Sequence, residues 1–172
     1  MKYFTCFILI TIYSQLSFAA PETNNNIPVM AKDNTEVPQH AIFRKTVKQD
    51  MEVVYKRVFT ALENNGYFVI FEPNIGKNLS HFAKRWGDDY NKNKLEHIRS
   101  MIFCNGWYAN KISNVNPYML ALCPLHITLY SKDNETNILF VKPSGVASGT
   151  NVADIARELE NDVIRAINTA IH

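Results

Sequence analysis

The sequence predicts an α+β domain, with a mainly antiparallel sheet covered on one face by helices. Apolar residues recur at three- and four-residue spacing in segments 51–65 and 152–171, which is typical of amphipathic helices. Shorter segments rich in β-branched and aromatic residues lie between turn-forming residues, as strands do. Two of these strands follow one another directly, joined by the polar turn 131–136, and such a hairpin interrupts any βαβ repetition.

The first half of the domain contains strands and helices in alternation. Residues 41–47 are predicted to be a strand, and Asp50 to cap a helix that Gly66 ends. The run YFVIF at 67–71 is wholly apolar, which predicts a buried strand. After Pro73 and Gly76, a second helix is predicted over 78–90, with one apolar face made of Leu79, Phe82, Ala83, Trp86 and Tyr90.

The second half begins with a strand at 98–104, followed by a turn and a short helix that Pro117 stops. The hairpin strands are predicted at 125–130 and 137–142. Asn151 is predicted to cap the last helix, whose apolar stripe is Val152, Ile155, Leu159, Val163, Ile167 and Ile171.

The N-terminus has the features of a secretory signal peptide over residues 1–19. Lys2 precedes an apolar run at 4–13, and Ser17 and Ala19 provide the small residues of a cleavage site. The run is too short to span about 30 Å of hydrocarbon as a helix. The prediction is therefore an exported protein, periplasmic or secreted, with no stable membrane anchor after cleavage. The alternative is an N-terminal anchor that stays uncut.

Two further segments follow the signal peptide. Residues 20–38 are polar and carry three prolines, which predicts a disordered leader. Residues 39–172 then form a single α+β domain. Loss of Lys2 with the signal peptide leaves basic and acidic side chains nearly balanced, which predicts no nucleic-acid partner. The locally basic segment 77–99 also contains acidic residues, and we interpret it as a solvated helix face.

Two cysteines, Cys104 and Cys123, stay in the exported chain, because Cys6 leaves with the signal peptide. Three interpretations are open: a disulfide, two buried free thiols, or a ligand or redox site. His126 lies on the polar side of its predicted strand and could approach Cys104 if the two strands are neighbours. No metal-ligand spacing of histidines occurs, so no metal site is assigned.

Aromatic residues follow the first of these cysteines. Trp107 and Tyr108 could form one wall of a ligand pocket, or could simply pack a short helix onto the sheet. The candidate ligand-binding residues are Cys104, Asn105, Trp107, Tyr108 and His126. No catalytic residue and no cofactor is assigned, since the chain lacks a glycine-rich phosphate loop and a G-x-S-x-G motif.

The segment 101–143 resembles the core of domain-of-unknown-function family 302. The pattern is a strand ending in Cys-Asn, a short helix, an Asn-Pro loop, and a proline before an apolar strand that ends in tyrosine. The matching residues are Cys104, Asn105, Asn116, Pro117, Pro124, Ile127 and Tyr130. The resemblance implies a TATA-binding-protein-like α+β fold over residues 40–172 that often pairs as a homodimer, and it implies no established activity.

The chain departs from the common pattern of this family in three ways. Gly106 and Trp107 follow the Cys-Asn pair, an insert lies around 88–96, and Cys123 is a second cysteine. These departures suggest an exported subgroup. The expected function is a non-enzymatic domain that binds a small ligand or a protein partner. The alternative is a thiol-dependent redox or metal-handling protein, and a third hypothesis is association as a homodimer through an exposed sheet edge.

Overall fold

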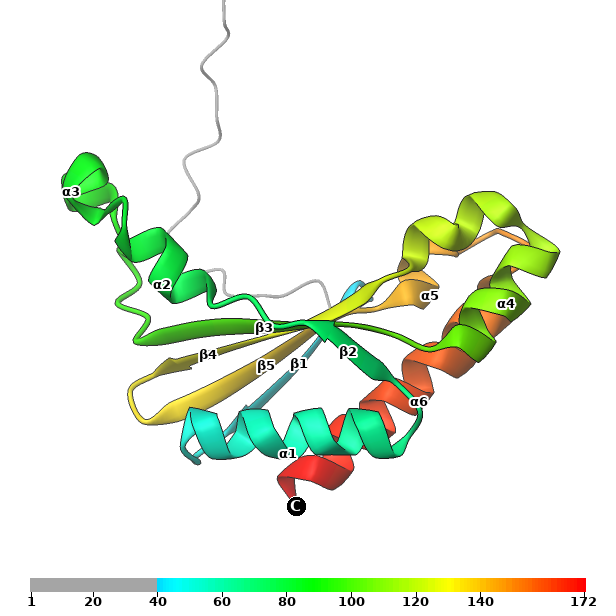
Figure 1. The fold of residues 1–172 in the computed structure, drawn as a ribbon, viewed down its shortest axis with the longest axis horizontal. Helices are drawn as coiled ribbons and strands as arrows, with labels where there is room; N and C mark the ends of the chain where they lie inside the picture. Colours follow the sequence, from blue (N-terminus) through cyan, green and yellow to red (C-terminus); the bar gives the residue numbers. More distant parts are fainter. Residues whose placement is uncertain (1–39) are drawn as a thin grey trace, which may run out of the picture. The chain divides into compact units, whose positions relative to one another are not determined.

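The computed structural model describes residues 40–172, which form one antiparallel sheet with its helices (Figure 1). Residues 1–39 lie outside the described part, and with them the predicted signal peptide and leader. The strands are β1 (Ile42–Val47), β2 (Phe68–Phe71), β3 (His97–Cys104), β4 (Leu125–Lys132) and β5 (Glu135–Val141). They are ordered β1-β5-β4-β3-β2, and every neighbouring pair is antiparallel, which confirms the predicted α+β class.

Two long helices, α1 (Met51–Asn64) and α6 (Ala153–Ile171), pack against each other beneath one face of the sheet (Figure 1). Asp50 caps α1 as predicted, since its Oδ1 accepts a hydrogen bond from the Val53 amide at 3.1 Å. Gly66 follows α1 with φ +75°, a backbone conformation that favours glycine. The core lies between this helix layer and the sheet, and its largest fully buried side chains include Tyr67, Phe103, Phe140, Leu62 and Met101.

The β4–β5 hairpin is tighter than predicted. The strands extend to Lys132 and from Glu135, which pair with each other, so the connection is only Asp133–Asn134 rather than a loop of six residues. Both turn residues have positive φ, 52° and 62°, as a two-residue turn of a twisted hairpin requires. Asp and Asn tolerate this conformation better than most residues.

At the opposite end of the sheet, three short elements pack near the start of α6: α4 (Gly106–Val115), a 3-10 helix at Pro117–Leu122, and α5 (Pro143–Val146). The prediction that Asn151 caps the last helix is wrong. The helix follows Val152, which makes no side-chain cap bond. The Asn151 amide is instead engaged with the end of α4, donating to the Val115 carbonyl and accepting from Asn116.

The predicted strand at 67–71 is present, but the prediction that it is buried is wrong. Tyr67 is fully buried, but β2 is an edge strand that pairs only with β3. Phe68 and Phe71 are 64% and 60% exposed because they lie on the face of the sheet that faces away from α1 and α6.

The predicted helix 78–90 is replaced by shorter pieces: α2 (Ile75–Ser80), α3 (Ala83–Trp86) and a 3-10 turn at Gly87–Asp89. Asn74 caps α2 four residues before the predicted start, and Gly87 with φ +52° ends α3. None of the three elements contains a buried residue. Residues 74–95 are called the arm below, and α2 and α3 project from the rest of the domain (Figure 1). Within residues 40–172, no helix is both long and apolar enough to cross a membrane.

Candidate functional site

The two cysteines come together where β3 ends and β4 begins. Cys104 is the last residue of β3, and Cys123 lies two residues before β4. The antiparallel register pairs Phe103 with Leu125, which brings the ends of these neighbouring strands to the same edge. Both cysteines are partly buried free thiols, and both line the same small cavity. The predicted disulfide depends on oxidation and stays a prediction.

Burial governs the acidity of one of these thiols. Removal from water raises the pKa of Cys123 to about 12, and the hydrogen bond and charge interaction with Cys104 act in the same direction. A thiol with so high a pKa is protonated at neutral pH and is a poor nucleophile. Cys123 therefore does not supply the activated thiolate that a cysteine catalyst needs.

Behind the two thiols is a small apolar cavity of about 10 Å³, room for about one water molecule. Its walls come from the end of β3, α4, the 3-10 helix 117–122 and α6. Besides the two cysteines, its lining includes Tyr108, Ile112, Met119, Leu122 and Leu159. Met119 adds a third sulfur-bearing side chain to the lining.

Asn105, one of the predicted ligand residues, holds the turn between β3 and α4. Its Oδ1 accepts from the amides of Trp107 and Tyr108 at 3.0 and 3.2 Å, which caps α4. Its amide group donates to the Gly66 carbonyl at 3.1 Å and so ties this turn to the end of α1. These bonds fix the position of Cys104 by fixing the residue after it.

Tyr108 forms one wall of the cavity. Its ring stacks on that of Tyr67, with centroids 6.5 Å apart, and its hydroxyl donates to Glu158 at 3.3 Å. Burial raises the pKa of Tyr108 to about 12, and the nearby carboxylates of Asp162 and Glu158 add to this. Tyr108 is therefore a neutral, positioned ring at neutral pH.

The other two predicted ligand residues lie elsewhere. Trp107 is 65% exposed and is not part of the cavity lining. His126 is exposed on β4 between the buried residues Leu125 and Ile127, so it points to the opposite face of the sheet from the core. Of the five predicted residues, the structure thus brings Cys104, Asn105 and Tyr108 together at the cavity.

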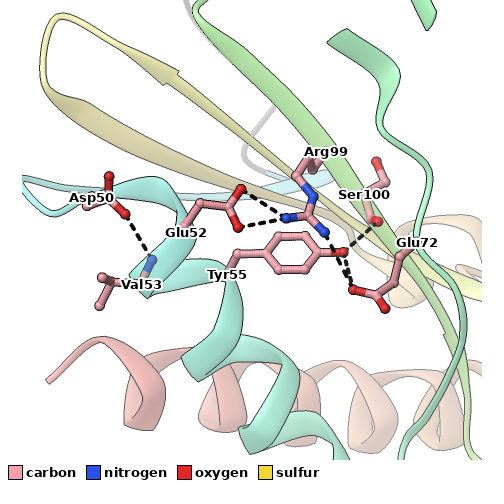
Figure 2. Close-up of polar contacts among 7 residues, drawn as sticks. All are labelled: Asp50, Glu52, Val53, Tyr55, Glu72, Arg99 and Ser100. Carbon is pink, nitrogen blue, oxygen red and sulfur yellow. Dashed lines mark hydrogen bonds and ion pairs between the residues drawn. The ribbon is translucent and has the colours of Figure 1, made fainter. Parts of the chain in front are cut away.

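A second hollow, of about 400 Å³, lies between α1 and β3 at the other end of the sheet. Figure 2 shows its centre, where the Arg99 guanidinium lies over the Tyr55 ring, 3.8 Å from its centroid. Arg99 Nη1 donates to both oxygens of Glu52 at 2.9 and 2.8 Å. Glu72 lies on the other side, 3.8 Å from Arg99 Nη2.

Tyr55 completes this cluster. Its hydroxyl donates to Glu72 Oε2 at 2.8 Å and to the Ser100 carbonyl at 3.1 Å (Figure 2). Burial, together with the hydrogen bond to Glu72, raises the pKa of Tyr55. Since both glutamates already neutralise Arg99, the cluster is best explained as a clamp that joins α1 to β3 and to the end of β2.

Sequence reasoning missed Met119 and the helix α6 side chain Leu159 as part of the cavity. A signal for Met119 was present, because it lies only four residues before Cys123 in the same short connection. No signal in the sequence pointed to Leu159, since its place in the apolar stripe of α6 predicts only burial.

Comparisons with known proteins agree with this architecture. A family model described as "Domain of unknown function DUF302" matches residues 43–170. A crystal structure of an uncharacterized conserved DUF302 protein from Bacillus stearothermophilus is similar in fold, with a TM-score of 0.64 and 17% identity. The match covers 76% of this chain and 98% of that one. No curated protein matches this chain. The family match spans most of the chain, and the chain therefore belongs to the DUF302 family.

Proposed function

We propose that this protein is a non-enzymatic binding domain whose ligand is a soft monovalent metal ion such as Cu(I), held by Cys104 and Cys123. The observation that carries the proposal is that these two thiols and the Met119 thioether line the same small cavity. Thiolate and thioether sulfurs are the ligands that select Cu(I).

The size of the cavity favours an ion over an organic ligand. Sites for small organic molecules usually enclose about 300–1,000 Å³. The space behind the thiols is about 10 Å³, and its lining is almost wholly apolar. A single ion fits such a space, while an aromatic or sugar ligand would require α4 to move away from the sheet.

The donor set favours a soft ion over zinc. Structural zinc sites take four ligands from cysteine, histidine or carboxylate. Among residues 40–172 no cluster of three such residues could hold a metal, and His126 points to the other face of the sheet. Two thiolates with one thioether suit an ion that binds few, soft ligands.

Binding at this site must displace protons. A metal ion takes the thiolate form, and the raised pKa of Cys123 means that its proton leaves when the metal binds. The apparent affinity should therefore rise with pH over the whole range below pH 12.

Titration of the reduced protein with Ag(I), a redox-inert substitute for Cu(I), tests the proposal in competition with a chelator of known affinity. We expect one ion per chain, and we expect Cys104→Ser and Cys123→Ser each to abolish binding. Met119→Leu should weaken it about tenfold, about 1.4 kcal/mol. His126→Ala is the matched control and should bind normally. Equal binding by wild type and the two serine variants would refute the proposal.

A second candidate is a reversible dithiol–disulfide centre, favoured by the place of two free thiols at one cavity. Exchange with an oxidised low-molecular-weight disulfide would join the two sulfurs, and two thiols of the oxidant would carry away the protons and electrons. Mass spectrometry after treatment with oxidised glutathione distinguishes this function, because it detects the loss of two hydrogens without any metal.

We also propose that the protein is exported after removal of residues 1–19, with Ser17 and Ala19 as the supporting residues. Native mass spectrometry of the protein recovered from outside the cytoplasm reads the N-terminus and also tests the homodimer. Ala20 at the N-terminus supports export, and a cytosolic product that retains Met1 contradicts it.

A further inference from the structure

The arm exposes apolar side chains that the rest of the described chain does not cover. Leu79, Phe82 and Trp86 are 36%, 44% and 41% exposed. The rings of Phe82 and Trp86 stack on each other, with centroids 5.0 Å apart and planes 20° apart. Phe82 directly precedes α3 and Trp86 ends it, while Leu79 lies on α2. The arm therefore presents one exposed aromatic face.

The base of the arm is fixed to the domain. The Ser100 amide donates to the Pro73 carbonyl at 3.1 Å, so the hydrogen bonding along this edge of β3 continues past the end of β2. A Cβ added at Gly76 would lie 3.1 Å from the Ile98 amide nitrogen, so glycine permits the close approach there. The start of α2 is thus held at β3, while α2 and α3 project from it (Figure 1).

The net positive charge of the chain is concentrated in the arm. Residues 74–95 contain five basic and only two acidic side chains, whereas the whole chain has a net charge of +2. The acidic residue Asp89 is already paired with Lys92 at 2.5 Å. All five basic residues of the arm are exposed: Lys77, Lys84, Arg85, Lys92 and Lys94.

We propose that the arm is a docking element for the surface of an anionic phospholipid bilayer. Trp86 would enter the interface, where aromatic rings with a polar edge concentrate, with the apolar ring of Phe82 beside it, and Lys84 and Arg85 would contact the lipid phosphates. Such a combination of Trp, Phe and Leu on one face with Lys and Arg on the other is the pattern of helices that lie in a membrane surface. Binding of this kind is peripheral and reversible.

Charge favours a lipid surface over a second copy of the chain. Two arms that met would bring together two clusters of like charge. Outside the arm, the chain has one more acidic than basic side chain, so a second copy offers little net negative charge to attract it. An anionic bilayer provides that surface over its whole area.

The test uses Trp86 itself as the reporter. Trp107 is the only other tryptophan in the chain, so full-length Trp107→Phe emits from Trp86 alone. We expect a blue shift of this emission, and quenching by brominated lipid, with vesicles of phosphatidylcholine containing about one third phosphatidylglycerol. Neither is expected with phosphatidylcholine alone. Because Trp86 reports its own environment, contact between residues 1–39 and lipid does not mimic the signal.

Two charge-reversal variants in the same background separate the arm from general electrostatics. Lys84→Glu/Arg85→Glu should weaken the partitioning at least tenfold. Lys56→Glu/Arg57→Glu, which reverses an equally exposed adjacent pair on α1, should change it less than twofold. Equal loss in both variants, an equal shift with neutral vesicles, or no shift with either vesicle would overturn the proposal. A Trp86 blue shift that depends on protein concentration without lipid would assign the arm to a second copy instead.

Discussion

The last helix and the arm have the same apolar periodicity but opposite burial. On α6, Leu159, Val163 and Ile167 are at most 3% exposed, since they pack against α1 and the sheet. On the arm, Leu79, Phe82 and Trp86 repeat at the same spacing, and α2 and α3 contain no buried residue. Periodicity therefore predicts that a helix has an apolar face, and does not predict what covers that face.

The difference follows from where each segment leaves the sheet. α6 follows the central hairpin and returns along the covered face, where it packs beside α1 (Figure 1). The arm follows β2, an edge strand, and leaves the sheet where no other strand or helix of the described chain lies over it. The apolar area that α6 buries stabilises the domain, whereas the arm buries little apolar area and contributes little to stability.

Removal of α6 should have the largest effect. A chain truncated before Asn151 loses the whole buried stripe of that helix, and each large side chain contributes on the order of 1.5–3 kcal/mol. The total stability of a domain is about 5–15 kcal/mol, so we expect no cooperative unfolding by circular dichroism. A truncated chain that still melted sharply near the full-length midpoint would contradict the assignment of α6 to the core.

Matched leucine truncations compare the two regions directly. Leu62→Ala on α1 removes a fully buried side chain and should lower the free energy of unfolding by about 2–5 kcal/mol. Leu79→Ala on α2 should cost less than about 1 kcal/mol, because the side chain is 36% exposed. Urea denaturation measures both. Similar losses in the two variants would show that Leu79 is buried in solution, and would contradict the difference in burial between the arm and the core helices.

The sequence predicted helices correctly where the signals lie within one element. Asp50 and Gly66 mark the two ends of α1, and the α6 stripe is buried, because capping and periodicity depend on residues close together in the sequence. The errors concern tertiary context. The run 67–71 looked buried, but its place at a sheet edge exposes Phe68 and Phe71. Asn151 was expected to cap α6, but its side chain forms hydrogen bonds at the end of α4 instead.

The site was predicted in part for the same reason. Cys104, Asn105 and Tyr108 are consecutive or nearly so, and one turn places them together. Cys123 joins them because β3 and β4 are neighbours, which the sequence left open. Trp107 was included for its place just after Cys104, and His126 for its place on the polar side of a strand that could neighbour Cys104. The direction of a side chain on α4 or β4 depends on register, which the sequence left open.

Removing single tyrosine hydroxyls should have an intermediate effect on the free energy of unfolding. Tyr55→Phe removes hydrogen bonds to Glu72 and to the buried Ser100 carbonyl, and should cost about 1–3 kcal/mol. Tyr118→Phe is the control, since Tyr118 is 89% exposed, and it should cost less than about 0.5 kcal/mol. If both variants unfolded at the wild-type urea concentration, the clamp in Figure 2 would have no role in stability.

The thiol pair predicts a dependence of stability on alkaline pH. The pKa of Cys123 is about 12 in the folded protein and about 8.5 in an unfolded chain, so the unfolded state loses its proton first. The contribution of Cys123 to the free energy of unfolding is therefore fully present below about pH 8.5 and declines as pH rises toward 12. Under reducing conditions, Cys123→Ala should show a smaller decline between pH 8.5 and 10, and the difference between the two curves reports Cys123 because both proteins contain the same tyrosines. Parallel curves for both proteins would mean that Cys123 is solvated.

The smallest effect is expected where the arm is most highly charged. Lys84→Glu/Arg85→Glu should change the free energy of unfolding by less than about 0.5 kcal/mol, because neither side chain makes an ion pair that the structure records and both are exposed. Urea denaturation in buffer without lipid provides the measurement, with Lys56→Glu/Arg57→Glu as the control on α1. A loss above about 1 kcal/mol in the arm variant alone would show that its charges stabilise the domain. An unchanged midpoint, combined with a larger loss of binding to anionic vesicles than the α1 control shows, would instead assign these charges to the membrane surface, because both variants change the net charge equally and differ only in where the charges lie.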